Sequence, residues 1–342
     1  MSTLHFDNEA NPAAVHAARG GELLASGHAA GAETCFQQAL VFDSGHVFAL
    51  ANLAWMRGQE GLLAEAESYY LRALAQVPDD VHLLQNLGAL LMTMRRPVEA
   101  ERIDRRVLAL APEMPSAWSN LGALLAAMQR ETEAERCYRH AIALDGDYAN
   151  ARYNLSYLLL RQGRLLEGWQ MLEARPQPTM FGAYFRFPRW QGEPLTGQSL
   201  LICPEAGMGD MLQLCRYASC LRQLGAARIS LLCHAPLKTL LLDLPEIDEV
   251  FAIGETVPDD GWNYWAPILS LPGLCGTTLE TIPAQLPYLW AQPQAVAAWR
   301  TRLPAAPLRV GLAWRGSAQF ENDDARSLAT LDVLAPLSAV DG

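Results

Sequence analysis

The sequence lacks the features that mark membrane-spanning, disulfide-rich and zinc-binding proteins. No uninterrupted apolar run approaches the roughly 20 residues that span a bilayer, and residues 1–20 lack a basic start followed by an apolar core. The seven cysteines are odd in number and include no Cys-x-x-Cys pair. We therefore expect a cytoplasmic chain with no membrane span and no bound metal, in which Cys203 and Cys233 are buried in strand-like apolar runs.

The sequence also has little positive charge. The net charge is −11 and no basic stripe offsets it, which argues against a nucleic-acid phosphate backbone as the main ligand. The acidic first half instead hints at a basic or neutral partner segment. At 342 residues, of which 51% are hydrophobic, the chain is long and apolar enough for two or more domains.

Asparagine recurs in the first half of the chain at a fixed spacing of 34 residues, and its neighbours repeat with the same period. This period divides the chain into repeats at 13–46, 47–80, 81–114 and 115–148, with a partial fifth from 149. Such self-similarity predicts a helical solenoid over residues 13–174. The recurring residues are Asn52, Asn86, Asn120 and Asn154.

Other columns of the repeat explain how its helices pack. One column holds small residues, a second holds alanine or glycine, and a third holds large side chains with Asp104 as the exception. Small residues let two helices approach closely, and Pro78 and Pro112 stand where each second helix must stop. The three columns are Gly20, Ala54, Gly88, Gly122, Ser156; Ala32, Ala66, Ala100, Ala134, Gly168; and Phe36, Tyr70, Asp104, Tyr138, Leu172.

After about residue 175 the repeat dissolves, and residues 175–198 read as a linker or docking segment rich in Gly, Pro and aromatic residues. Short apolar runs then alternate with helical stretches, which predicts βαβ units and a parallel sheet. The expected strands are 200–203 and 228–233, with weaker candidates at 250–253 and 268–271. The expected helices are 211–224, closed by Gly225, and 237–242.

The first strand-to-helix turn, residues 205–210, is the most interesting chemically because ligands of open α/β sheets bind at the carboxyl ends of the strands. Its Gly207-x-Gly209 lacks the third glycine of a dinucleotide site and the lysine of a Walker motif. The turn could face a phosphate or a sugar. A simpler reading remains open, in which the glycines make a tight turn and Asp210 caps the helix.

Two resemblances follow from these motifs. The repeats resemble the tetratricopeptide repeat, and residues 117–122 are a near-consensus first helix. The stretch from Pro188 to about Leu337 resembles the glycosyltransferase-like region of bacterial repeat proteins, itself similar to the heptosyltransferase family with its GT-B fold of two Rossmann halves. The matching pieces include Glu167-Gly168-Trp169, Trp190-x-Gly192-Glu193, Gly207-Met208-Gly209-Asp210, Leu269-Ser270-Leu271-Pro272, Gly311-Leu312-Ala313-Trp314-Arg315-Gly316 and Arg326-Ser327.

The second resemblance implies transfer of a sugar from a nucleotide sugar to a protein or glycan acceptor without a metal. It implies that Asp210 is the general base, while Gly207 and Gly209 face the donor phosphates. Arg315 and Arg326, after a strand expected at 309–314, would neutralise the departing diphosphate; they also read as ordinary surface arginines. His234 is an alternative base, or else a solvent-facing loop residue.

The repeats suggest how an acceptor is recruited. The row of four asparagines would hold a peptide backbone, since an amide both donates and accepts, and Trp55, Tyr153 and Tyr157 would lie on the same helix faces. The alternative is that the asparagines serve packing within each repeat and the aromatic residues belong to the core.

Residues 199–305 correspond to the first half of a GT-B enzyme, and residues 306–342 only begin the second half. We therefore expect weak or absent transferase activity from this chain. Two hypotheses stand at this point: a glycosyltransferase, or part of one, and a non-catalytic peptide-binding scaffold with a relic half-domain.

Overall fold

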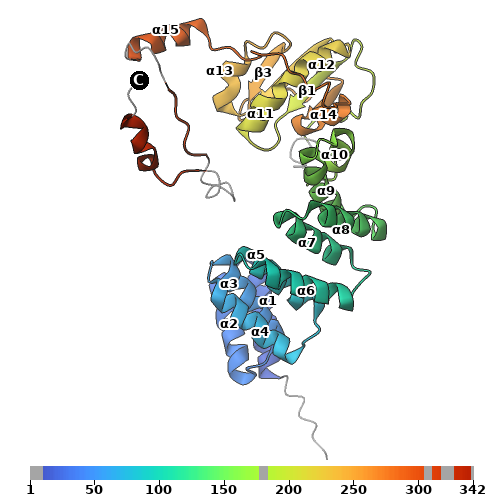
Figure 1. The fold of residues 1–342 in the computed structure, drawn as a ribbon, viewed down its shortest axis with the longest axis vertical. Helices are drawn as coiled ribbons and strands as arrows, with labels where there is room; N and C mark the ends of the chain where they lie inside the picture. Colours follow the sequence, from blue (N-terminus) through green and yellow to red (C-terminus); the bar gives the residue numbers. More distant parts are fainter. Residues whose placement is uncertain (1–10, 177–183, 304–309, 317–326, 340–342) are drawn as a thin grey trace, which may run out of the picture. The chain divides into compact units, whose positions relative to one another are not determined.

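The computed structural model describes residues 11–176, 184–303, 310–316 and 327–339 (Figure 1). The chain forms two compact units, residues 1–288 and residues 289–342. The first unit contains the helical repeats and the parallel sheet, and the candidate site lies within it. No helix in the described ranges is long and apolar enough to cross a membrane.

The first half of the chain is a tetratricopeptide-like solenoid of helix pairs, as the 34-residue period predicts. The fifth pair is present as well. Each second helix ends before the predicted stop, with Gln76 two residues ahead of Pro78 and Leu110 two ahead of Pro112. The pairs are α1 Pro12–Ala25 with α2 Ala29–Phe42, α3 Val47–Gln59 with α4 Leu63–Gln76, α5 Val81–Thr93 with α6 Pro97–Leu110, α7 Pro115–Ala127 with α8 Glu131–Leu144, and α9 Ala149–Arg161 with α10 Leu165–Leu172.

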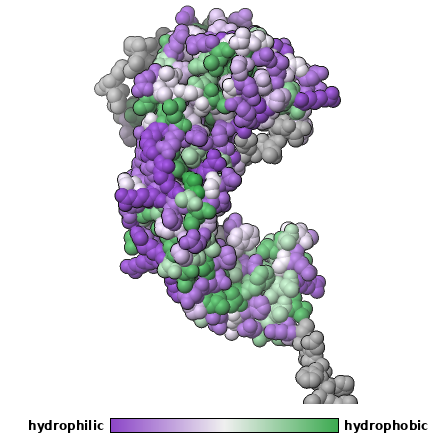
Figure 2. All heavy atoms as spheres, turned by 90° about the vertical axis from the view of Figure 1, so that its right-hand side faces the viewer, coloured by the Kyte–Doolittle hydropathy of each residue, from purple (hydrophilic) through white to green (hydrophobic). Residues whose placement is uncertain are grey.

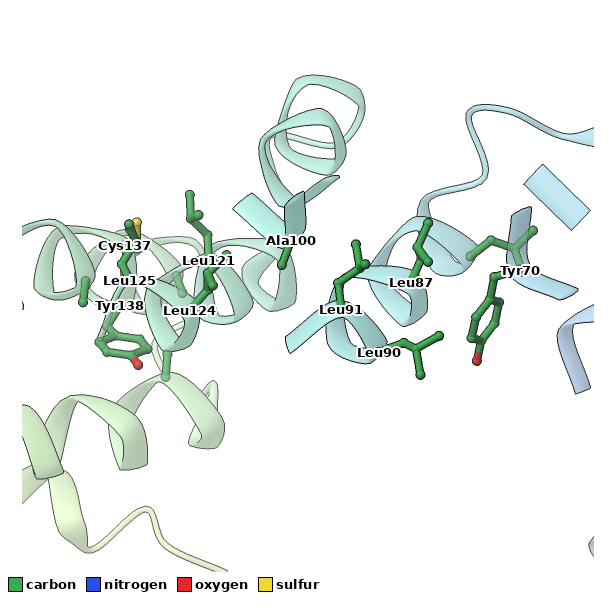
Figure 3. Close-up of a cluster of buried hydrophobic side chains, with 14 of the residues drawn as sticks. Tyr70, Leu87, Leu90, Leu91, Ala100, Leu121, Leu124, Leu125, Cys137 and Tyr138 are labelled. Atoms are coloured by element: carbon green, nitrogen blue, oxygen red, sulfur yellow. The ribbon is translucent and has the colours of Figure 1, made fainter. Parts of the chain in front are cut away.

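The small-residue columns are where the two helices of a pair touch. A Cβ atom placed on Gly122 would lie 2.7 Å from the ring of Tyr138, and one on Gly20 would lie 2.7 Å from the ring of Phe36. Ala134 and the other alanines of its column are fully buried. Figure 3 shows leucines of the first helices and tyrosines of the second helices sharing one hydrophobic cluster. The predicted close approach of helices at the small-residue columns is confirmed.

Neighbouring repeats are also joined by a ladder of ion pairs that the sequence reading missed. An arginine at the start of one second helix reaches a glutamate in the second helix before it, at N–O distances of 2.7 to 2.8 Å. The spacing along the chain is 29 residues in each case. Each pair is partly exposed and contributes little alone, but the shared partners make a network. The pairs are Arg96–Glu67, Arg130–Glu101 and Arg164–Glu135.

The second half of the first unit is a four-stranded parallel sheet flanked by short helices (Figure 1). The strand order β3-β2-β1-β4 confirms an α/β arrangement, and Ile202 of β1 stands opposite Leu231 of β2. The strands are β1 Ser199–Cys203, β2 Arg228–Cys233, β3 Glu249–Ala252 and β4 Tyr264–Pro267, and the helices are α11 Met208–Leu214, α12 Ala218–Gln223, α13 Lys238–Leu241 and α14 Leu271–Leu274.

Three predicted elements differ from the structure. The helix expected over 211–224 is interrupted by a 3-10 turn at Cys215–Tyr217. The strand expected at 268–271 is wrong: residues Ile268–Ser270 form a 3-10 turn, because Pro272 fixes a helical backbone at the start of α14, and the strand is β4 just upstream. Residues 310–316 form no strand, and the described part of the second unit offers no other strand for them to pair with.

The segment around residue 190 docks against the sheet. Trp190 is buried, and its backbone N–H donates to the carbonyl of Trp265 at 2.8 Å. At the adjoining solenoid end, α14 packs closely on α10, since a Cβ on Gly273 would lie 2.9 Å from Cβ of Trp169. The described residues between the solenoid and β1 therefore belong to the packed first unit.

The second unit is described only in part. Its helix α15, Pro293–Arg302, buries none of its residues, and Trp290 and Trp299 are exposed. A 3-10 segment follows at Leu331–Ala339.

Candidate functional site: the asparagine face and the turn after the first strand

The four recurrent asparagines lie on the first helices of repeats two to five. Asn86 and Asn120 are exposed, whereas Asn52 and Asn154 are half-buried. We call the helix faces that carry these four side chains the asparagine face. Asn52 donates from Nδ2 to the carbonyl of Phe48 at 2.8 Å, while within the described residues the other three amides make no hydrogen bond. Packing within the repeat therefore does not account for those three.

Aromatic side chains also line the asparagine face. Trp55 follows Asn52 by three residues, and Tyr157 follows Asn154 by three. Each aromatic side chain therefore lies on the same side of its helix as the asparagine. They are 48% and 57% exposed, so the interpretation of these two as core residues is wrong. The hydroxyl of Tyr157 lies 2.6 Å from that of half-buried Tyr153. Trp55 and Tyr157 are therefore both accessible to a ligand.

The asparagine face carries no acidic residue. Helices α3, α5, α7 and α9, which form it, contain no Asp or Glu. Each of the second helices α4, α6, α8 and α10 contains glutamate, and their glutamates pair with arginines in the ion-pair ladder. The surface of the repeats accordingly mixes hydrophilic and hydrophobic patches in Figure 2. Of the two partner charges expected from the sequence, this distribution favours a neutral segment.

The turn after β1 is anchored to the end of the solenoid by a buried ion pair. Both groups are almost fully buried, and Arg175 donates to Glu205 through Nε at 2.7 Å and through Nη2 at 2.8 Å. Arg175 also donates to the hydroxyl of Ser270 at 2.7 Å and to the carbonyl of Leu172 at 3.1 Å. The turn is thereby held between the last repeat and the carboxyl edge of the sheet. Sequence reasoning missed this pair because its members lie 30 residues apart.

Asp210 lies in the first turn of α11 and is half-buried. Its Oδ2 accepts a hydrogen bond from the backbone N–H of Gly207 at 2.9 Å. Asp210 therefore makes the capping contact that the simpler interpretation expects at the start of this helix. Neither Gly207 nor Gly209 has a positive φ; Ala206 takes that conformation, at 59°. A Cβ on Gly209 would meet nothing within 4 Å. The expectation that the glycines make the tight turn is thus wrong, and the space beside Gly209 is open.

The end of the asparagine face lies near this turn. The pKa of Tyr157 is raised to about 12, first by burial, then by the hydrogen bond with Tyr153 and the charge of that residue, and further by the carboxylate of Asp210. Asp210 is therefore close enough for its charge to act on the Tyr157 hydroxyl. The charge of one predicted catalytic residue thus acts on one predicted peptide-binding aromatic residue.

The remaining predicted site residues are not gathered at this turn. Arg315 is exposed and belongs to the second unit, and Arg326 lies outside the described residues. His234 follows β2 and is half-buried; its Nδ1 is buried and has no hydrogen-bond partner in the described part of the chain. No group of three or more His, Cys, Asp or Glu in the described ranges is arranged to hold a metal ion. The roles assigned to these residues stay predictions.

Comparison with known proteins supports the assignment of tetratricopeptide repeats to the helical half of the chain. Residues 115–148 match a family model described as tetratricopeptide repeat, which is the fourth repeat of the 34-residue register. The chain is 27% identical over 201 residues to Protein FlbA of Caulobacter vibrioides, a match that covers 52% of this chain and 33% of that protein. The chain thus spans about a third of the length of this curated relative.

Solved structures of similar fold cover the same half. MamA from Desulfovibrio magneticus RS-1 is 15% identical, with a TM-score of 0.43, over 48% of this chain and 92% of its own. PilF of Pseudomonas aeruginosa is 20% identical, with a TM-score of 0.45, over 49% and 79%. YrrB, a repeat protein described as having an unusual peptide-binding site, is 20% identical, with a TM-score of 0.41, over 49% and 87%. Residues 115–148 are thus a tetratricopeptide repeat, in a solenoid that occupies roughly the first half of this chain.

Proposed function

We propose that this protein is an interaction scaffold that binds an extended, uncharged segment of a partner protein along the asparagine face. The observation that carries the proposal is the row of amides at one repeat position, three of which have no partner in the described structure. A row of donors and acceptors at constant spacing can hold a peptide backbone without reading its side chains.

The charge distribution supports a neutral partner segment. The first helices of repeats two to five contain no acidic residue, and their exposed surface offers amides, hydroxyls and aromatic rings to an incoming segment. A strongly basic segment would lose solvation on these helices without gaining an opposite charge. Exposed Trp55 and Tyr157 would add contact area at low conformational cost.

The test is selection of binding peptides from a random peptide library on the full chain, followed by affinity measurement with the selected peptides. Replacing Asn120 and Asn154 by alanine should weaken binding about 30-fold, since two hydrogen bonds contribute roughly 1 kcal/mol each. The matched control is Gln38→Ala, an exposed amide on α2 away from the asparagine face. Equal affinities for all three proteins would refute the proposal.

A second function is suggested by the turn that carries Asp210, which the Arg175–Glu205 ion pair holds at the end of the solenoid. We propose that the α/β region, as the first half of a GT-B glycosyltransferase, transfers a sugar from a nucleotide sugar to a hydroxyl group of the bound segment. Asp210 would accept the hydroxyl proton as the C–O bond forms, and the nucleoside diphosphate would leave with the electron pair of the broken bond. The ion pair that anchors this turn to the end of the last repeat supports this arrangement, because a segment bound along the repeats would end on the side of the base.

This second proposal is tested with UDP, GDP and ADP, titrated calorimetrically into the unmodified chain and into Asp210→Asn. A donor site predicts that one of them binds both proteins, and that any consumption of the corresponding nucleotide sugar, expected to be weak in this chain, is lost in Asp210→Asn. Asp243→Asn, an exposed carboxylate outside the turn, is the control and should behave as the unmodified chain. Absence of binding by all three nucleotides at millimolar concentration would refute the assignment for this chain.

A further inference from the structure

A cavity of about 300 Å³ opens between the second and third repeats. It is bounded by Trp55 and Gln59 from α3, by Leu63 and Tyr70 from α4, and by α5, which contributes Asn86 of the asparagine row. Its volume lies at the small end of the roughly 300–1,000 Å³ typical of ligand pockets. No charged side chain is among the described residues that line it. The cavity is therefore a continuation of the asparagine face, lined by both polar and apolar groups.

Tyr70 supplies a polar group at this cavity that the protein itself does not satisfy. The residue is only 4% exposed, and burial raises the pKa of its hydroxyl. In the described part of the chain this hydroxyl makes no hydrogen bond. Figure 3 shows its ring beside Leu87 and Leu90, with the oxygen at the edge of the cluster rather than among the carbons. The hydroxyl oxygen is still reached by water through the cavity, so a ligand that enters must offer a hydrogen bond in place of the water that it displaces.

This combination of residues does not recur along the solenoid. The position of Trp55 is occupied by Ala89, Ala123 and Tyr157 in the following repeats, and the position of Tyr70 by Asp104 and Tyr138. A tryptophan at the first of these positions together with a tyrosine at the second therefore occurs in one repeat only. The asparagine row is the same in repeats two to five and cannot fix the register of a bound peptide. A single pocket that does not repeat along the solenoid can fix this register.

We propose that this cavity is a specificity pocket for one tyrosine side chain of the bound segment. This inference rests on the proposed peptide-binding function. The ring of the guest tyrosine packs between the Trp55 indole and Leu90, and its hydroxyl pairs with that of Tyr70. Asn86, at the rim, pairs with the backbone of the same residue. A guest Lys or Glu would enter without an opposite charge, and a guest phenylalanine would leave the Tyr70 hydroxyl unpaired.

The experiment is a double-mutant cycle between protein and peptide. The tightest peptide from the library selection is measured with its aromatic residue as Tyr and as Phe, against the full chain and against Tyr70→Phe. The hydroxyl pair predicts that either single change weakens binding about fivefold and that the second change then adds almost nothing. Trp55→Ala should weaken the tyrosine peptide at least tenfold, whereas Leu71→Ala, an exposed residue of α4 that does not line the cavity, should have no effect.

Several outcomes overturn the pocket while leaving peptide binding intact. Selected peptides that depend on Asn120 and Asn154 but show no enrichment of tyrosine would do so, as would additive effects of the two hydroxyl deletions. If no peptide is selected at all, the proposed function and the pocket both fail. Urea unfolding of Tyr70→Phe serves as the folding control, and its midpoint should be unchanged or slightly raised because the deleted hydroxyl has no partner.

Discussion

Asp104 offers the sharpest stability prediction because it is a buried carboxylate in a column of large side chains. It lies in α6, is 6% exposed and occupies the position held by Phe36, Tyr70 and Tyr138 in three other repeats. Burial, and then the charge of Glu101, raise its pKa from the ordinary 3.8 to about 7. An acid whose pKa is raised by folding destabilises the protein as the pH rises from its unfolded to its folded value.

The magnitude follows from the two pKa values. The difference of 7 − 3.8 = 3.2 units, at 1.36 kcal/mol per unit, gives a cost of about 4 kcal/mol above pH 7. Between pH 5 and pH 8 the cost grows by the part from 5 to 7, about 3 kcal/mol. Asp104→Asn removes the charge at nearly the same size. The variant should therefore be more stable than the natural chain at pH 8, with a smaller advantage at pH 5.

The assay is urea unfolding of both proteins at pH 5 and pH 8. Comparing the two proteins at each pH cancels the contributions of all groups that they share. Asp104→Tyr is the second variant: Gly88 lies against the carboxylate, with an added Cβ 2.8 Å from Oδ1, just as Gly122 lies against the ring of Tyr138. It should stabilise the fold at pH 8 as well. Parallel pH profiles for the natural chain and Asp104→Asn would refute the reasoning.

Two further predictions concern packing and the domain junction. Gly122→Ala should lower the free energy of unfolding by about 1–3 kcal/mol because the new methyl group would lie 2.7 Å from the Tyr138 ring. The control is Gly58→Ala, where nothing lies within 4 Å of the added Cβ. This control should be neutral or stabilising by up to about 1 kcal/mol. The two midpoints in urea give the comparison, and equal shifts would contradict the close approach. Arg175→Ala should cost about 3–5 kcal/mol because it leaves Glu205 buried without its partner. Replacing Arg175 by Met and Glu205 by Leu should recover most of that loss in thermal unfolding, and a double variant no more stable than Arg175→Ala would contradict this account.

The limits of sequence reasoning show in particular elements. The strand at residues 228–233 was predicted to the residue because a buried apolar run is a local signal. The apolar run at 268–271 gave the same signal and proved to be a 3-10 turn, since Pro272 decided the backbone there. The asparagine row was recognised from its period, but whether its amides were free or used in packing depended on neighbours that only the fold supplies.

The sequence by itself determined the 34-residue helix pairs, because small residues, large rings and proline stops act within one repeat or between adjacent helices. Tertiary structure alone decided how distant groups meet. It pairs Arg175 with Glu205, it places Asp210 within electrostatic reach of Tyr157, and it leaves the Tyr70 hydroxyl without a partner beside a cavity. These outcomes depend on how separate elements pack, and spacing along the chain carries no record of an ion pair or a cavity formed by residues from different helices.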